Sequence, residues 1–189
     1  SYIFGSTHLA AADFNRDGFM DIATNGIDAI VVFYGLGDGT FQDSVGYAVG
    51  GRPIGVAAAD FNGDGIPDLA PAIYSANTTS VILGLQSGGF SGPAQYAAGN
   101  IPYNLSAGDF NEDGIVDIVV VNNLSSDISV FIGVQSGGFA PQVRYPSGLY
   151  PSSVAIGDFD GDDILDLVVN AGGDQSIRLF KGGGSGGVG

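Results

Sequence analysis

The sequence predicts an all-β fold, a β-propeller of four-stranded antiparallel blades, and three observations lead to this prediction. The pattern DFNRDGFMD, which begins at Asp13, returns in variants that begin at Asp60, Asp109 and Asp158, at intervals of 47, 49 and 49 residues. Each interval holds four short runs rich in Val, Ile and Phe, bounded by Gly, Asn, Ser and Asp. No window shows the 3.6-residue period of an amphipathic helix. A unit of four short strands is typical of a propeller blade.

The third repeat shows the expected elements of one blade in chain order. The inner strand LSAGDF (105–110) enters an acidic loop, and DIVVVN (117–122) leaves it as a second strand of β-branched residues. A polar turn separates this strand from the third, ISVFIG (128–133), and a Gly-rich turn precedes the fourth, FAPQVRY (139–145). The other repeats follow in register, with VAAADF (56–61) as the inner strand of the second.

We interpret the chain as a single domain (1–189) of about four blades, with repeats at about 2–46, 47–95, 96–144 and 145–189. One blade cannot bury both of its faces, whereas stacked blades bury a continuous core.

The two ends match different parts of a blade. YIFG (2–5) matches YAVG (47–50) at the end of a fourth strand, and KGGGSGGVG (181–189) matches the turn that precedes a fourth strand. Three alternatives therefore stay open: four blades that close alone, a homodimer that closes an eight-bladed ring, and a segment of a larger propeller. Open sheet edges favour association.

Composition excludes several classes of protein. The formal net charge is −15 with only five Lys and Arg residues, which argues against binding to nucleic acid or to anionic membranes. The chain has no cysteine, so it forms no disulfide and has no thiolate site. No run of about 18 apolar residues is present, so we expect no membrane span.

The repeated pattern is an acidic loop of nine residues, numbered here from its first aspartate. Side chains at positions 1, 3, 5 and 9 carry oxygen, and position 7 is apolar, so it offers only its backbone carbonyl. Glycine at position 6 permits the positive φ that a tight turn needs. The candidate metal-ligating residues are Asp13, Asn15, Asp17, Phe19 and Asp21; Asp60, Asn62, Asp64, Ile66 and Asp68; Asp109, Asn111, Asp113, Ile115 and Asp117; and Asp158, Asp160, Asp162, Ile164 and Asp166.

These ligands predict Ca²⁺, at about four ions per chain. Four or more side-chain oxygens with one carbonyl are hard ligands of the kind Ca²⁺ takes, whereas Mg²⁺ demands tighter octahedral geometry. Zn²⁺ would require His or Cys, and the chain holds one His and no Cys. The pattern argues against an EF-hand, because position 12 lacks its glutamate and we expect strands rather than helices on both sides of the loop.

The competing interpretation is that Asp, Asn and Gly simply form good turns. Four such loops at a fixed period favour metal binding, because three carboxylates within nine residues repel one another unless a cation neutralises them. The fourth loop differs from the others: Asp163 replaces the glycine of position 6 and Asp160 adds a carboxylate. We therefore expect its affinity for the ion to be altered.

The motif D-F-[ND]-x-D-G-x-x-D after a VA-x-x-DF strand, with a later G-x-x-x-G-x-F turn, resembles the FG-GAP/VCBS-type repeat. The bacterial type is more similar than the integrin α-subunit type. The resemblance covers nearly the whole chain. It implies a β-propeller with Ca²⁺ in the loops between the first two strands of each blade, all on one face.

The expected function is non-catalytic: a calcium-stabilised propeller for extracellular or cell-surface adhesion or ligand recognition, lectin-like or protein-binding. The alternative is a structural scaffold or an accessory module of a larger secreted protein or enzyme. We expect no enzyme activity, because the same carboxylates recur four times rather than forming one unique pair. The family's plan puts the remaining loops on the opposite face, where the candidate ligand-binding residues are Arg52, Tyr74, Asn77, Tyr103, Asn123 and Tyr150.

Overall fold

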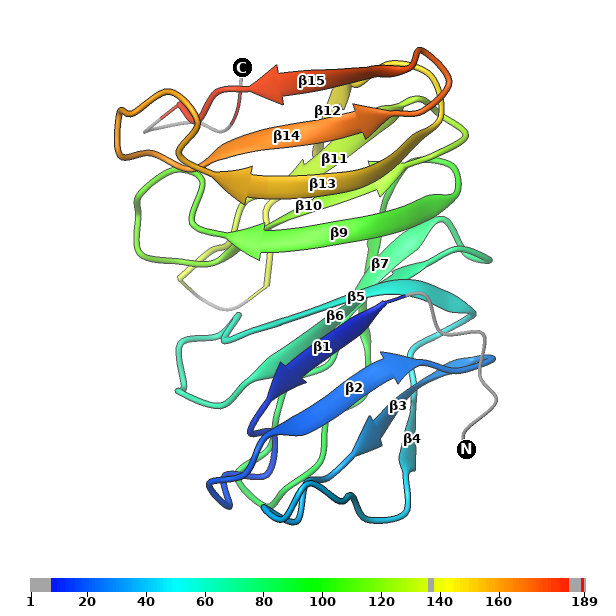
Figure 1. The fold of residues 1–189 in the computed structure, drawn as a ribbon, viewed down its shortest axis with the longest axis vertical. Helices are drawn as coiled ribbons and strands as arrows, with labels where there is room; N and C mark the ends of the chain where they lie inside the picture. The colour runs from blue at the N-terminus through cyan, green and yellow to red at the C-terminus, as the bar shows by residue number, and fades with distance from the viewer. Residues whose placement is uncertain (1–7, 136–137, 184–187, 189) are drawn as a thin grey trace.

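The computed structural model describes residues 8–135, 138–183 and 188, and it confirms the all-β propeller-like fold (Figure 1). Fifteen strands form four antiparallel sheets within this part of the chain, which contains no helix. In the same residues, no helix is long and apolar enough to cross a membrane. The predicted YIFG match (2–5) and most of the glycine-rich tail (184–187 and 189) lie outside the described residues.

Each sheet is one blade, and its strands pair in chain order. Blade 1 contains β1 (Leu9–Ala12), β2 (Asp21–Asn25), β3 (Ala29–Phe33) and β4 (Val45–Ala48). Blade 2 contains β5 (Pro53–Ala59), β6 (Asp68–Ile73), β7 (Thr78–Val81) and β8 (Ala94–Ala97). Blade 3 contains β9 (Pro102–Gly108), β10 (Asp117–Asn122), β11 (Asp127–Phe131) and β12 (Val143–Pro146). Blade 4 contains β13 (Pro151–Gly157), β14 (Asp166–Ala171) and β15 (Ser176–Phe180).

The inner strands differ in their bounds from the sequence prediction. In blade 3, the inner strand β9 begins at Pro102 and ends at Gly108, rather than spanning 105–110. It ends early because the Phe110 N–H donates to the side-chain carboxylate of Asp117 and not to a backbone carbonyl of a neighbouring strand. The outer strand β12 is also shorter than predicted, since 139–142 contribute only one isolated bridge, between Gly133 and Phe139.

Apolar side chains between successive blades form three cores. One phenylalanine from each of the first three blades, at position 2 of its acidic loop, is buried in the core toward the next blade. These residues are Phe14, Phe61 and Phe110. Stability therefore comes from packing between blades as well as from strand pairing within them.

The blades form an open row rather than a closed ring. Figure 1 shows blade 1 at the bottom and blade 4 at the top, with the inner strands β1, β5, β9 and β13 succeeding one another between them. The loops between first and second strands all lie along the left edge of this view, and the loops between second and third strands lie along the right edge. The fold thus separates the acidic loops from the candidate ligand face.

Candidate metal-binding loops and the opposite face

The acidic loops join the inner strand of each blade to its second strand. Position 9 is the first residue of the second strand in every blade, as Asp68 is in β6. Positions 1 to 8 lie between the strands. Residues 13–21, 60–68, 109–117 and 158–166 therefore occupy equivalent places on one edge of the row (Figure 1).

Backbone N–H groups turn the side chains of each loop inward. In the second loop, Asp60 accepts hydrogen bonds from the N–H groups of Gly63 (2.7 Å) and Asp64 (3.1 Å) on Oδ1 and of Gly65 (2.8 Å) on Oδ2. Asn62 Oδ1 accepts from Asp64 N (2.9 Å), and Asp64 Oδ1 accepts from Ile66 N (2.8 Å). The other loops repeat most of these bonds, so the local sequence itself gathers the side-chain oxygens.

Two positions of every loop have positive φ. Position 6 was predicted to do so, and its angles are +90° for Gly18, +80° for Gly65, +83° for Gly114 and +69° for Asp163. Position 4 shares the conformation, which the sequence analysis missed. Its residues are Arg16, Gly63, Glu112 and Gly161, at +61°, +75°, +60° and +84°. The glycines at two of these four positions were the feature of the sequence that could have predicted this positive φ.

The position-9 aspartate is fully buried in all four loops and has a role that the sequence analysis missed. Its Oδ2 accepts the N–H of the position-2 phenylalanine, and its Oδ1 accepts the N–H of a glycine in the turn before the outer strand. In blade 2 these distances are 2.8 Å for Asp68 to Phe61 and 2.7 Å for Asp68 to Gly84. The equivalent aspartates are Asp21, Asp117 and Asp166.

This carboxylate explains the recurrent glycine of the G-x-x-x-G-x-F turn. A Cβ on Gly84 would lie 2.6 Å from the Pro67 carbonyl oxygen and 2.6 Å from Ile66 Cγ2. Gly35, Gly133 and Gly182 have the same obstruction. The recurring aspartate and the recurring glycine are therefore one structural unit, in which close approach of the two loops brings the N–H to the carboxylate.

Burial and neighbouring carboxylates raise the pKa of three position-9 aspartates, Asp21, Asp68 and Asp117. Burial raises the pKa of Asp68 to about 6, with smaller raising contributions from Asp64 and Asp60, against the lowering effect of the two backbone N–H donors. Burial raises the pKa of Asp117 to about 6 in the same way. Burial also raises the pKa of Asp21. A nearby cation would reverse these directions.

The fourth loop gathers the most carboxylates. One carboxylate oxygen from each of Asp158, Asp160 and Asp166 lies within 4.8 Å of the others, the one such group of acidic residues among those described. Lys181 Nζ lies 2.7 Å from Asp160 Oδ2, and the hydrogen bond to Lys181 lowers the pKa of Asp160. Lys181 stands where the other blades carry Tyr34, Leu83 and Ile132. A lysine therefore compensates the additional carboxylate of this loop.

The donor set fits a hard divalent cation. The first three loops offer carboxylate, side-chain amide and backbone carbonyl oxygens, and the fourth offers carboxylate and backbone carbonyl oxygens. A carboxylate oxygen that accepts one N–H keeps a further lone pair. The ammonium of Lys181 at the fourth loop shows a cation next to one of these oxygens. The side chain at position 7 is buried at Ile66 but exposed at Phe19, so it anchors the loop in blade 2 and not in blade 1.

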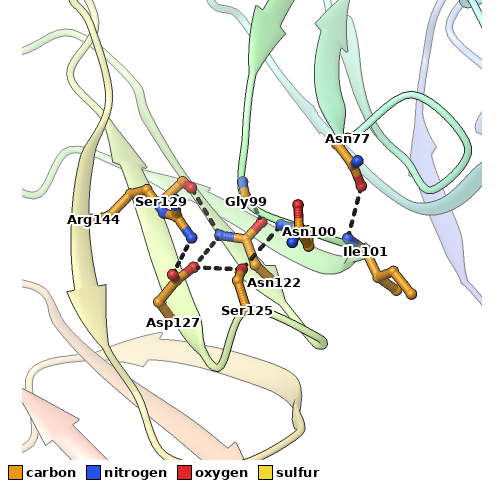
Figure 2. Close-up of polar contacts among 9 residues, drawn as sticks. All are labelled: Asn77, Gly99, Asn100, Ile101, Asn122, Ser125, Asp127, Ser129 and Arg144. Atoms are coloured by element: carbon orange, nitrogen blue, oxygen red, sulfur yellow. Dashed lines mark hydrogen bonds and ion pairs between the residues drawn. The ribbon is translucent and has the colours of Figure 1, made fainter.

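Two candidate ligand residues on the opposite face form hydrogen bonds between adjacent blades. Asn77 Oδ1, in the β6–β7 loop, accepts the Ile101 N–H of blade 3 at 2.9 Å, as Figure 2 shows. Asn123 Nδ2, in the β10–β11 loop, donates to the Pro151 carbonyl of blade 4 at 3.0 Å. Their amides hold neighbouring loops in place.

The other four candidates do not form one cluster with these two. Arg52 is exposed, and its backbone bonds to Tyr74 and Ser75 order the loop before β5. Tyr74 and Tyr150 are exposed, whereas Tyr103 is half-buried, with its ring edge-on to His8. Among the described residues, no hydrogen bond, ion pair or ring contact joins Arg52, Tyr103 and Tyr150 into a single site.

A polar network in blade 3 was not anticipated. The buried Asn122 side chain accepts the Gly99 N–H at 3.0 Å and donates to Asp127 and Ser129, both at 2.8 Å (Figure 2). Arg144 forms an ion pair with the same Asp127. Asn122 takes the place of Ile73 in blade 2 and Ala171 in blade 4, and this break in an apolar column was the available signal.

Comparisons with solved structures show the same fold. A lectin from Agrocybe aegerita, described as recognising non-reducing terminal N-acetylglucosamine, is 19% identical with a TM-score of 0.64, over 95% of this chain and 49% of the lectin. A protein from Lactobacillus plantarum is 15% identical with a TM-score of 0.67, over 93% of this chain and 51% of that one. The V. cholerae biofilm matrix protein Bap1 is 20% identical with a TM-score of 0.57, over 96% of this chain and 27% of Bap1.

This chain therefore spans about half the length of the first two structures and about a quarter of the third. A search of curated protein sequences finds no match. The family model described as FG-GAP-like repeat matches residues 13–70 and 109–169, more than half of the chain, and each match begins at position 1 of an acidic loop. On this match and on the propeller-like blades, the chain belongs to the FG-GAP-like repeat family.

Proposed function

We propose that the four acidic loops bind Ca²⁺ and that the bound ions stabilise the blades. The observation that carries this proposal is the convergence of three carboxylates in the fourth loop within 4.8 Å, in a chain whose other loops have the same backbone conformation. Carboxylates held this close repel one another, and a divalent cation removes that repulsion. Hard oxygen ligands at this spacing suit Ca²⁺.

The residues at positions 1, 3, 5 and 9, with the position-7 carbonyl, would hold the ion. Bound Ca²⁺ supplies positive charge that offsets the acidic side chains, and four ions reduce the formal charge from −15 to −7. Binding adds to the free energy of unfolding because the unfolded chain lacks the assembled site. The position-9 aspartate, which would bind the ion, is also the first residue of the second strand, so a bound ion would connect the loop to the sheet.

We further propose that the propeller is a non-catalytic recognition module at the cell surface or outside the cell. Millimolar Ca²⁺ in that compartment suits weak modular sites. Exposed tyrosines on the face opposite the acidic loops, Tyr74 and Tyr150, offer stacking surfaces for a carbohydrate or a protein. The fold shared with a lectin supports carbohydrate as the first class of ligand to test. Four alike carboxylate loops suit metal binding better than one catalytic pair.

The metal proposal is tested by thermal melts of the chain in excess EDTA and in millimolar Ca²⁺, with metal content measured on the same samples. We expect about four Ca²⁺ per chain and a higher melting temperature with Ca²⁺. Asp64→Asn should reduce both the metal content and this increase. Asp28→Asn is the matched control, since Asp28 is exposed and lies outside the loops. Equal melting temperatures with no bound calcium would overturn the proposal.

The recognition proposal is tested on a glycan array with the calcium-loaded protein. We expect binding that Tyr150→Ala weakens while the melting temperature stays unchanged. An array without hits would count against carbohydrate recognition and would leave a protein ligand or a scaffold role as the alternatives.

A further inference from the structure

The outward face of blade 4 carries side chains that are buried in every other blade. The position-2 phenylalanine is 0% exposed at Phe14, 2% at Phe61 and 0% at Phe110, but 52% exposed at Phe159. The third strand repeats this contrast, because Ile177 is 74% exposed. Its equivalents Ile30, Thr79 and Ile128 are all 0% exposed.

The outward face of blade 1 shows the complementary contrast. Leu9 on the inner strand is 67% exposed, while its equivalents Val56, Leu105 and Val154 are 7 to 9% exposed. Phe41 is 39% exposed, while Phe90 in blade 2 is 8% exposed. The row of blades therefore ends in two different faces. Each end face resembles one side of the interfaces that successive blades form with one another inside the chain.

A recurrent aromatic pair shows how the two halves would fit. Phe14 of blade 1 meets Phe90 of blade 2 edge-on, with 5.5 Å between ring centroids. Phe61 of blade 2 meets Phe139 of blade 3 in the same way, at 5.8 Å. The unmatched members of this series are Phe159 at one end of the row and Phe41 at the other (Figure 1 shows the two ends).

We propose that a second copy of this chain covers both end faces, head to tail, so that two copies form one ring of eight blades. In each seam, blade 4 of one copy packs on blade 1 of the other, and Phe159 faces Phe41 of the second copy. Contacts between two different faces close into a ring when the rotation between copies permits it.

The chemistry of the seam supports a copy rather than an unrelated partner. The end faces carry apolar residues at repeat positions whose equivalents form the three cores between blades. Lys181 is the charged exception on the blade 4 face, and its ion pair with Asp160 compensates its charge. Exposed apolar side chains that gather on one face are typical of an association site.

The experiment is sedimentation velocity on the calcium-loaded chain over a wide range of concentration. We expect a species of twice the 19.1 kDa chain mass. Leu9→Asp and Ile177→Asp should each convert it to the monomer, because each substitution places a charge in both seams. Both side chains are exposed within one copy, so the variants should keep their strand content by circular dichroism.

Leu124→Asp is the matched control, since Leu124 is 54% exposed but lies in the β10–β11 loop away from the end faces. This variant should keep the doubled mass. A monomer at every concentration would overturn the proposal. So would loss of the dimer in only one of the two end-face variants, which would indicate pairing between like faces. Species heavier than the dimer would show an open head-to-tail chain in place of a ring.

Discussion

Asp68 and Gly84 are 16 residues apart in the chain, and the Gly84 N–H donates to Asp68 Oδ1 over 2.7 Å. The other oxygen of Asp68 accepts the Phe61 N–H at 2.8 Å. One buried carboxylate thus joins three segments of blade 2: the start of its acidic loop, the start of β6 and the turn before β8. The same arrangement recurs in the other three blades, so the position-9 aspartate stabilises the blade with or without an ion.

Asp68→Asn should destabilise the protein in EDTA as well as in Ca²⁺. The amide presents only one acceptor atom, so one buried N–H loses its partner, at a cost of about 2 kcal/mol in the free energy of unfolding. Urea denaturation in each condition measures this. Asp64→Asn is the comparison, because Asp64 is exposed and should matter mainly when Ca²⁺ is bound. Identical profiles for the two variants would contradict separate roles.

Gly84→Ala should lower the free energy of unfolding by about 1 to 3 kcal/mol. The added methyl group would meet the Pro67 carbonyl oxygen at 2.6 Å and push the turn away from Asp68. Gly92→Ala is the control, since an added Cβ there meets no atom within 4 Å. Denaturant midpoints compare the two, and a neutral Gly84→Ala would mean that the turn is free to shift.

Removal of calcium should reverse the pH dependence of stability. In the calcium-free protein the pKa of Asp68 and of Asp117 is about 6, above the ordinary 3.8, so the folded state binds protons more tightly than the unfolded state. The stabilising contribution is then fully present below about pH 4 and is lost as the pH rises through about 6. We expect the melting temperature in EDTA to fall by a few degrees between these values.

With Ca²⁺ bound, the ion holds the carboxylates ionised, and the melting temperature should rise over the same interval. Thermal melts in matched buffers measure both series. A melting temperature in EDTA that climbs between about pH 4 and about pH 7 would contradict the raised pKa of these aspartates.

Lys181→Leu should increase the Ca²⁺ affinity of the fourth loop several-fold. The ammonium now lies 2.7 Å from Asp160 Oδ2, and its removal leaves that oxygen free for the ion. Leucine is chosen because Leu83 occupies the equivalent place in blade 2. Calcium titration calorimetry should show one site tighter and the rest unchanged. An unaltered titration would show that the lysine and the ion do not compete.

Much of the fold could be predicted from the sequence because the sequence pattern of one blade recurs four times. The period located the acidic loops, and the position-6 glycines indicated the positive φ that the structure has. The strand ends were less predictable: Phe110 looks like a strand residue, but its N–H bonds to Asp117 across the loop. A backbone hydrogen bond to a side chain seven residues away produces no periodic pattern in the sequence.

The contacts between loops on the opposite face could not be predicted, for a related reason. Asn77 and Asn123 are polar and lie in loops, as ligand-binding residues often do, yet their amides hydrogen-bond to the next blade. Sequence patterns within one repeat cannot show a contact between loops of two repeats. Asn122 was missed because a buried amide within a run of valines reads as part of the strand.

The hydrogen bonds of the two loop asparagines also affect how the protein should be produced. Asn77 begins the triplet Asn-Thr-Thr and Asn123 begins Asn-Leu-Ser, both acceptor sequences for N-linked glycans. A glycan on either amide nitrogen would crowd the contact with Ile101 or replace the hydrogen that Asn123 donates to Pro151. Expression in a host that attaches such sugars would therefore weaken the contacts between blades 2 and 3 and between blades 3 and 4. Expression in a bacterial host that attaches no such sugars would leave these contacts intact.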